Sequence, residues 1–208
     1  YYTYDDLPDG VAALEHFSIG TGEPGAPDAT RDMKNVVPVL QEIVSINPAV
    51  KIMASPWSAP AWMKTSNRID GSGRLRLGEY VGNGYRYQDT IDYVYAQYFV
   101  KFIEAYAKLG IHITSVTMQN EPSNGCPWPI TVWTPEELTQ WGSEYLRPAL
   151  DRTFPDVEIY FGDDSLRFWQ RPASEYMTPA QAQCFAGAAF HTYSGLPTWV
   201  HNGTPVSY

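Results

Sequence analysis

One glutamate stands where a hydrophobic segment of the chain ends. Glu121 follows the alternating apolar run IHITSVTMQ and lies between Asn120 and Pro122. Apolar surroundings, with Trp128 nearby, disfavour the charged form of a carboxylic acid and suit it to act as a general acid. The amide of Asn120 can hydrogen-bond a substrate hydroxyl group beside it. The sequence Asn-Glu-Pro therefore predicts a catalytic carboxyl group rather than one that only caps a neighbouring element.

Other groups that often do chemistry lack partners at a useful spacing. His16, His112 and His201 show no metal-ligand spacing with one another or with a cysteine, so we expect no metal site. Ser55 and Ser58 lack the His–Asp pattern of a hydrolase triad. No glycine-rich phosphate loop follows any hydrophobic segment, so we expect no nucleotide cofactor.

The two cysteines do not make a disulfide framework. We expect Cys126 and Cys184 to be free, partly buried thiols, with a bridge between them as the less favoured alternative.

The charge and hydropathy of the chain limit its partners. A formal net charge of -9 over 208 residues argues against nucleic acid and anionic membrane surfaces. No run of 18 apolar residues is present, so we expect no transmembrane segment. The chain opens YYTYDDLPDG, without an initiator Met or a signal peptide. We therefore expect a mature or trimmed piece of a secreted or extracellular protein.

Aromatic residues are unusually frequent. Seven Trp and fifteen Tyr exceed what a core of this size usually requires, and aromatic rings are the common platform for stacking on sugar faces. Packing explains more than half of them. We expect at least two of the tryptophans in loops to pack and the others to stack on substrate; these four are Trp62, Trp128, Trp133 and Trp169.

Helical and strand-like segments alternate along the chain. Four short apolar segments predict buried strands, at residues 50–55, 111–119, 157–161 and 185–190. Helical spacing of apolar residues predicts helices at 33–46, 90–109 and 134–152. Such alternation predicts a parallel sheet covered by helices.

Two α/β architectures fit this order, an open doubly wound sheet and a closed (β/α)₈ barrel. The missing phosphate loop disfavours the first. Polar and aromatic residues at every strand end favour the second, because strands of a TIM-type barrel deliver their carboxyl ends to one site. A closed barrel needs about 250 residues and eight strands. We therefore expect residues 1–208 to be a single partial barrel covering roughly strands three to six, with strands one, two, seven and eight and any β-sandwich domain largely absent.

Several motifs together resemble one enzyme family. The motifs SVTMQNEPSNG and KIMASPWSAPAWMKTS resemble those of glycoside hydrolase family 30, the glucosylceramidase-like group of (β/α)₈ glycosidases. The resemblance continues through YTYDD, EHFSI, YFVKFIEAYAKLGI, IYFGDDS and FHTY, and so covers nearly the whole chain. Asn-Glu-Pro alone is shared by many related families, whereas ASPWSAPAWMK makes the resemblance specific.

This resemblance implies a role for each matching residue. Glu121 would be the acid/base and Asn120 would hydrogen-bond the sugar 2-hydroxyl. Trp57 would line the subsite of the cleaved sugar. His191 and Tyr193 would lie in the site, with the tyrosine near the nucleophile.

The family's nucleophile is a glutamate at the end of strand seven. No glutamate follows Glu175 in this chain, so we expect the nucleophile to lie beyond Tyr208. Asp163 and Asp164 are the rival carboxylates, since retaining enzymes place their two carboxyl groups about 5–5.5 Å apart and inverting ones about 6.5–9.5 Å apart. We expect structural or substrate-binding roles for both aspartates.

The resemblance implies a retaining β-glycoside hydrolase. Its substrate would be a β-linked glucoside, either glucosylceramide or, as the alternative, β-1,6-glucan. Two further hypotheses stay open: a carbohydrate-binding fragment that lacks the nucleophile, and a doubly wound α/β binding protein of another kind.

We expect Lys64 and Arg68 to hold their loop together, with contact to the aglycone as the alternative.

Overall fold

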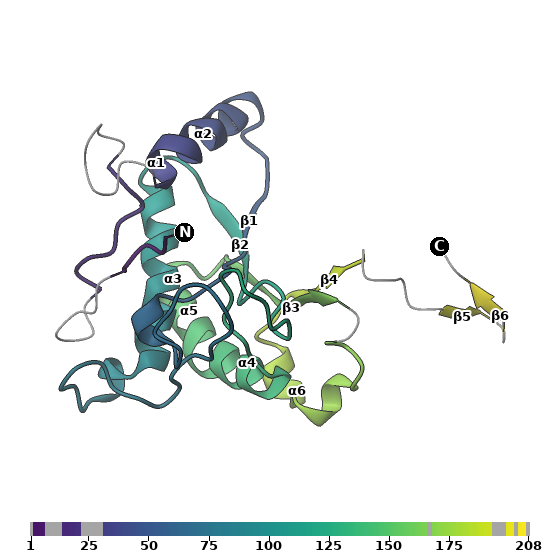
Figure 1. Cartoon of the computed structure of the whole chain (residues 1–208). Helices are drawn as coiled ribbons and strands as arrows, with labels where there is room; N and C mark the ends of the chain where they lie inside the picture. The colour runs from purple at the N-terminus through teal and green to yellow at the C-terminus, as the bar shows by residue number, and fades with distance from the viewer. Residues whose placement is uncertain are drawn as a thin grey trace.

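The centre of the molecule is a parallel sheet of four strands. A computed structural model describes residues 2–6, 14–21, 31–165, 168–192, 199–201 and 204–206. Consecutive strands are neighbours, and every pair is parallel (Figure 1). The strands are β1 (Ile52–Ala54), β2 (Ile113–Thr117), β3 (Glu158–Ser165) and β4 (Gly187–His191).

This sheet is open in the described part of the chain. β1 and β4 are its two edges, and Met53 and Phe190 on these edges are about half exposed, at 49% and 52%. All four strands lie within or beside the predicted segments. The parallel order confirms the prediction of an α/β, TIM-type partial barrel.

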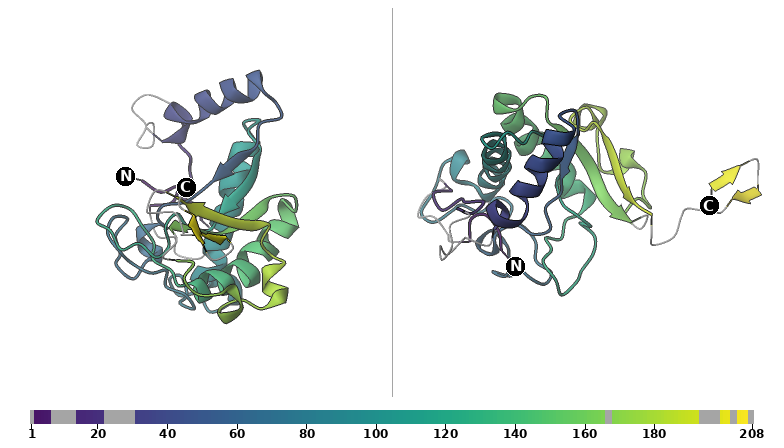
Figure 2. Two further views of the ribbon diagram at one scale, coloured as in Figure 1. Left: turned by 90° about the vertical axis from the view of Figure 1, so that its right-hand side faces the viewer. Right: turned by 90° about the horizontal axis from the view of Figure 1, so that it is seen from above.

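The two helices nearest the sheet begin where the sequence predicts. Helix α3 (Ile91–Ala107) starts after Thr90, whose hydroxyl accepts a hydrogen bond from the backbone N–H of Tyr93. Helix α4 (Pro135–Trp141) starts with a capping box between Thr134 and Glu137. α3 contacts β2, and α4 contacts β3. Figure 2 shows both helices beside the sheet.

Two predicted helices are interrupted. The first divides at Val36 into α1 (Asp32–Asn35) and α2 (Val37–Ile46), and a proline at the second position of α2 removes one backbone donor there. The third divides into α4, a π-helical turn (Gly142–Leu146) and α5 (Arg147–Thr153).

The π-helical turn coincides with a proline and with a close packing contact. Arg147 donates its backbone N–H to the carbonyl of Gly142, five residues back, and Pro148 has no N–H to continue the α-helical pattern. A Cβ atom on Gly142 would lie 2.6 Å from the sulfur of Met118 and 2.8 Å from the ring of Phe185. The absence of a side chain at Gly142 therefore lets the helix approach the sheet closely.

The segment between β3 and β4 holds short elements. They are a 3₁₀ turn (Ala173–Glu175) and α6 (Pro179–Ala182). A small antiparallel sheet of β5 (Trp199–His201) and β6 (Thr204–Val206), which the sequence did not predict, lies apart from the main sheet in Figure 1.

Aromatic side chains fill much of the core between helices and sheet. The Tyr95 and Trp141 rings have centroids 5.1 Å apart, and those of Trp133 and Trp141 are 5.4 Å apart. All three are at least 98% buried, so much of the aromatic excess serves packing.

The N-terminal segment is attached to this core by tyrosines. The buried carboxylate of Asp32 accepts hydrogen bonds from the hydroxyls of Tyr2, Tyr4 and Tyr106, at 2.7, 2.8 and 2.5 Å.

Among the described residues, no helix has the length and apolar character needed to cross a bilayer.

Candidate active site

The turn after β2 carries Asn120 and Glu121 in a fixed conformation. Glu121 has a φ of 49°, which is uncommon for a residue other than glycine and persists only where neighbours impose it. Its backbone N–H donates to the carbonyl of Asp163 at 2.8 Å, and that of Asn120 donates to the carbonyl of Pro56 at 2.8 Å. The segment that follows β1 and the carboxyl-terminal part of β3 therefore both hold this turn in place.

A pocket of about 360 Å³ opens beside the turn. Such a volume is in the range of ligand sites, about 300–1,000 Å³. The indole side chains of Trp57 and Trp128 are 53% and 41% exposed and present flat apolar faces. Asn124 donates its side-chain amide to the Oε2 atom of Glu121 at 2.8 Å. The pocket is lined by Trp57, Asn120, Glu121, Asn124 and Trp128.

A β-bulge in β3 directs two consecutive aspartates to different partners. The register against β4 shifts between Gly162 and Asp164, which leaves Asp163 without a ladder partner. Gly162 and Asp163 both have a left-handed backbone, with φ values of 91° and 64°. Bulges of this kind commonly redirect side chains next to active sites. The strand predicted at residues 157–161 therefore extends four residues further, to Ser165.

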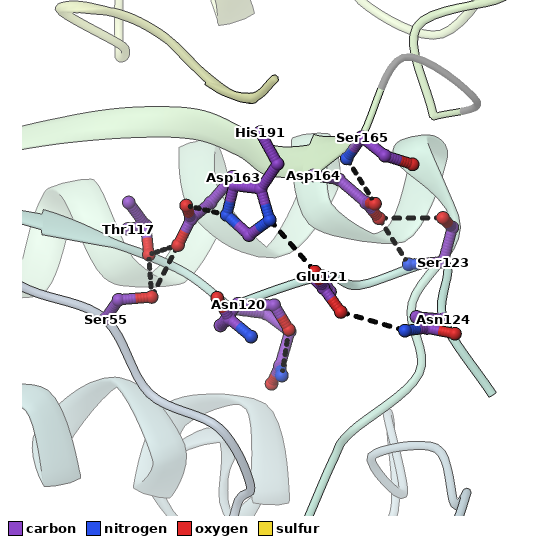
Figure 3. Close-up of polar contacts among 11 residues, drawn as sticks. Ser55, Thr117, Asn120, Glu121, Ser123, Asn124, Asp163, Asp164, Ser165 and His191 are labelled. Carbon is purple, nitrogen blue, oxygen red and sulfur yellow. Dashed lines mark hydrogen bonds and ion pairs between the residues drawn. The ribbon is translucent and has the colours of Figure 1, made fainter. Parts of the chain in front are cut away.

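Asp163 and Asp164 both have their carboxylates engaged (Figure 3). Asp163 Oδ2 accepts from the hydroxyls of Ser55 and Thr117, at 2.5 and 2.7 Å. Asp164 Oδ2 accepts from the backbone N–H and hydroxyl of Ser123, at 2.8 and 2.7 Å, and its Oδ1 accepts from the N–H of Ser165 at 2.6 Å. Asp164 thereby anchors the loop that follows Glu121.

His191, the last residue of β4, lies between two carboxylates (Figure 3). Its Nδ1 is 3.0 Å from Glu121 Oε1, and its Nε2 is 3.0 Å from Asp163 Oδ1. All three side chains are at most 16% exposed. Burial lowers the pKa of His191, but the hydrogen bonds and negative charges of Glu121 and Asp163 outweigh it, so the net shift raises this pKa.

The structure groups most of the residues singled out in the sequence. Four of them line the pocket, and Asp163 and His191 form a chain of contacts that ends on Glu121. Tyr193 lies outside the described residues. Of the four loop tryptophans, Trp133 is buried, Trp62 and Trp169 pack against the core, and Trp128 lines the pocket.

The remaining expectations concern metals and thiols. No group of three potential metal ligands occurs among the residues that the structure describes. Cys126 and Cys184 are both free thiols, as expected, and burial raises the pKa of each.

For three residues of the site, the sequence predicted no role there. Ser55 and Thr117 hold Asp163, and Asn124 holds Glu121. Ser55 and Thr117 are polar residues at the carboxyl ends of neighbouring strands, which is a usable signal. Asn124 lies three residues after Glu121, a spacing at which side chains meet within one turn.

Lys64 and Arg68 hold their loop, as the sequence predicts. The Arg68 guanidinium pairs with Asp70 at 3.0 Å. Lys64 is fully buried, and its Nζ donates to Ser58 Oγ and to the carbonyls of Ile69 and Gly71, at 3.1, 3.2 and 3.4 Å. Burial lowers the pKa of Lys64 to about 8.

This lowered pKa predicts a pH-dependent contribution of Lys64 to stability. Between about pH 8 and pH 10.5 the unfolded chain keeps a proton on Lys64 that the folded protein has lost, so the free energy of unfolding rises with pH. We expect wild type to gain about 1–3 kcal/mol over a Lys64→Met variant across this range. Denaturant titrations from pH 7 to 10.5 measure the difference.

The matched control is Lys108→Met, which removes an exposed lysine paired with Glu104 on α3. Its difference from wild type should stay constant with pH. A constant difference for the Lys64 variant as well would contradict the prediction.

Comparison with known proteins identifies the family. The sequence profile of the glycosyl hydrolase family 30 TIM-barrel domain matches residues 1–204. The chain is 32% identical to the lysosomal acid glucosylceramidase of Mus musculus over 198 residues, 92% of this chain and 35% of that protein. It is also 32% identical to an endo-1,6-β-D-glucanase of Aspergillus fumigatus over 218 residues, 98% of this chain and 41% of that protein.

Solved structures agree with the sequence relatives. The endo-β1,6-glucanase BT3312 superposes with a TM-score of 0.73 at 29% identity, over 94% of this chain and 40% of that one. SrfJ from Salmonella typhimurium superposes with a TM-score of 0.67 at 32% identity, over 79% of this chain and 35% of that one. The chain spans well under half the length of these relatives. It belongs to glycosyl hydrolase family 30.

Proposed function

We propose that the intact protein is a retaining β-glycoside hydrolase in which Glu121 is the acid/base. The observation that carries this proposal is the position of Glu121, whose carboxyl group is the one carboxyl among the described residues that line the pocket. Glu121 would protonate the leaving glycosidic oxygen and then accept a proton from the water that hydrolyses the glycosyl-enzyme.

The proposed nucleophile is a second carboxylate beyond Tyr208. The engaged contacts of Asp163 and Asp164 support this assignment, because neither carboxylate lines the pocket and both accept at least three hydrogen bonds from protein groups. A carboxylate held in this way is poorly placed to attack an anomeric carbon.

The proposed substrate is a β-linked glucoside. Trp57 and Trp128 offer faces on which a sugar ring can stack, and the amide of Asn120 can bind the sugar 2-hydroxyl. The relatives are named for two substrates, glucosylceramide and 1,6-β-D-glucan. We propose glucosylceramide or a similar β-glucoside, with β-1,6-glucan as the alternative; kcat/KM values measured on both substrates discriminate between them.

A carbohydrate-binding role is the second candidate for the 208 residues alone. It is favoured by the presence of one pocket carboxylate, since double displacement needs two. The isolated segment would then bind a β-glucoside in equilibrium dialysis but release no glucose.

Covalent trapping tests the proposed mechanism. An activated 2-deoxy-2-fluoro-β-glucoside slows breakdown of the glycosyl-enzyme, so the intact protein should gain the mass of one fluoroglucosyl group. We expect peptide mapping to place it on a glutamate beyond Tyr208. A label on Asp163 or Asp164 would contradict the assignment of the nucleophile, and hydrolysis with inversion would contradict double displacement.

A further inference from the structure

Asp163 reaches the proposed acid/base by two separate routes. Its side chain contacts His191, which contacts Glu121, with both distances at 3.0 Å. Its main-chain carbonyl accepts the backbone N–H of Glu121 at 2.8 Å. Resting on the proposed function of Glu121, we propose that Asp163 is a positioning residue that acts on Glu121 through His191.

The carboxylate of Asp163 is held in one orientation. The hydroxyls of Ser55 and Thr117 occupy Oδ2, so Oδ1 is the oxygen that faces His191. Ser55 directly follows β1 and Thr117 ends β2, whereas Asp163 belongs to β3. The β-bulge at Asp163 turns its side chain toward Ser55 and Thr117, because Asp163 has no partner in the ladder to β4.

This orientation determines which nitrogen of His191 carries a proton. An ionised carboxylate can only accept hydrogen bonds, so Asp163 keeps the proton on Nε2. Nδ1 then faces Glu121 Oε1. One further proton lies between these two atoms, either on the carboxyl group of Glu121 or on the imidazole.

The shared proton suits both steps of a double displacement. With the proton on Glu121, the carboxyl group is ready to donate to the leaving oxygen. With the proton on His191, Glu121 is ionised and can accept a proton from water. The negative charge of Asp163 stabilises the second form, because it lies against the imidazolium that this form creates.

A purely structural role for Asp163 predicts a different result. If Asp163 only stabilised the β-bulge, its substitution would lower the stability of the protein and leave the pH dependence of turnover unchanged. The described charged groups that act on His191 are Glu121 and Asp163. Removing the charge of Asp163 must therefore make the Glu121–His191 pair lose its proton at a lower pH.

The test compares Asp163→Asn with wild type in the intact enzyme. We expect kcat on an alkyl β-glucoside to fall about 10- to 100-fold, which corresponds to the loss of one charge-assisted hydrogen bond. KM should change by less than about threefold, because Asp163 lies outside the pocket. We expect the alkaline limb of the kcat/KM profile to move about one pH unit lower.

The matched control is Asp156→Asn, which makes the same substitution at an exposed position just before β3. It should leave kcat, the pH profile and the melting temperature unchanged. Glu121→Gln is assayed alongside, so that the two proposals can fail separately. An active Glu121→Gln would overturn the proposed function itself, and Asp163 would then have no acid/base to position.

The positioning role alone is overturned if Glu121→Gln is inactive while Asp163→Asn keeps the wild-type kcat and pH profile. If Asp163→Asn does not fold, His191→Gln replaces it, since the amide retains a donor for Asp163 but cannot be charged. That variant should also lose turnover and shift the alkaline limb downward; an unshifted profile overturns the proposal.

Discussion

Glu121→Gln in the intact protein is expected to lower kcat on an alkyl β-glucoside by about 10²–10⁴-fold, the usual contribution of general acid–base catalysis. The substitution keeps the size of the side chain and the pocket formed with Trp57 and Trp128, so binding should persist. What is lost is a proton for the leaving oxygen. KM should therefore change much less than kcat.

The leaving group distinguishes acid catalysis from general damage to the site. A dinitrophenolate departs without protonation, so the first step of Glu121→Gln should approach the wild-type rate on the dinitrophenyl β-glucoside. The second step still lacks a base, and added azide, which needs none, should restore turnover. Equal losses on alkyl and dinitrophenyl substrates would contradict the assignment.

A control variant tests whether any glutamate on this sheet has such effects. Glu158→Gln changes an exposed residue at the start of β3, at the opposite end of the strand from Asp163. It should be fully active on both substrates. Wild-type activity of Glu121→Gln on the alkyl glucoside would exclude Glu121 as the acid/base.

Much of this site could be predicted because its geometry follows from simple rules. Apolar runs become parallel strands, and the carboxyl ends of such strands meet at one edge of the sheet. Residues directly after a run, such as Trp57 after β1 and Glu121 after β2, must then lie close together. The shared pocket agrees with this reasoning.

The contacts of Asp163 and His191 could not be predicted, because they depend on register. The apolar run VEIYF ends at Phe161, yet β3 continues to Ser165 through pairing with β4. The one-residue bulge decides that Asp163 faces His191 and that Asp164 faces Ser123. The apolar pattern of VEIYF does not show a one-residue bulge beyond Phe161, and a shift of one residue changes which side chains point to each face.

One of the two helix interruptions, the one at Gly142, also depends on contacts with distant parts of the chain. Gly142 packs closely on Met118, which directly follows β2, and on Phe185, which lies just before β4. Apolar periodicity shows that one face of a helix is buried, but it does not show how close the neighbouring element lies. The tryptophans illustrate this as well, since Trp133 is 2% exposed and Trp128 is 41% exposed.

Gly162→Ala is expected to lower the free energy of unfolding by about 2–4 kcal/mol. Gly162 begins the bulge with a φ of 91°, a conformation that alanine adopts at a cost. A Cβ atom there would lie 2.0 Å from the indole ring of Trp169, so the ring or the strand has to move. Urea denaturation of the intact protein measures the loss.

Gly78→Ala separates backbone strain from the clash. Gly78 has a similar φ of 76°, but no atom lies within 4 Å of the position of an added Cβ. Its loss should be about 1 kcal/mol, the strain alone. Because Gly162 immediately precedes Asp163, the folded fraction of Gly162→Ala should also show the reduced kcat and lowered alkaline limb expected for Asp163→Asn, whereas Gly78→Ala should show neither. Equal losses in the two alanine variants would mean that Trp169 gives way freely and that the clash at Gly162 adds nothing to the backbone strain.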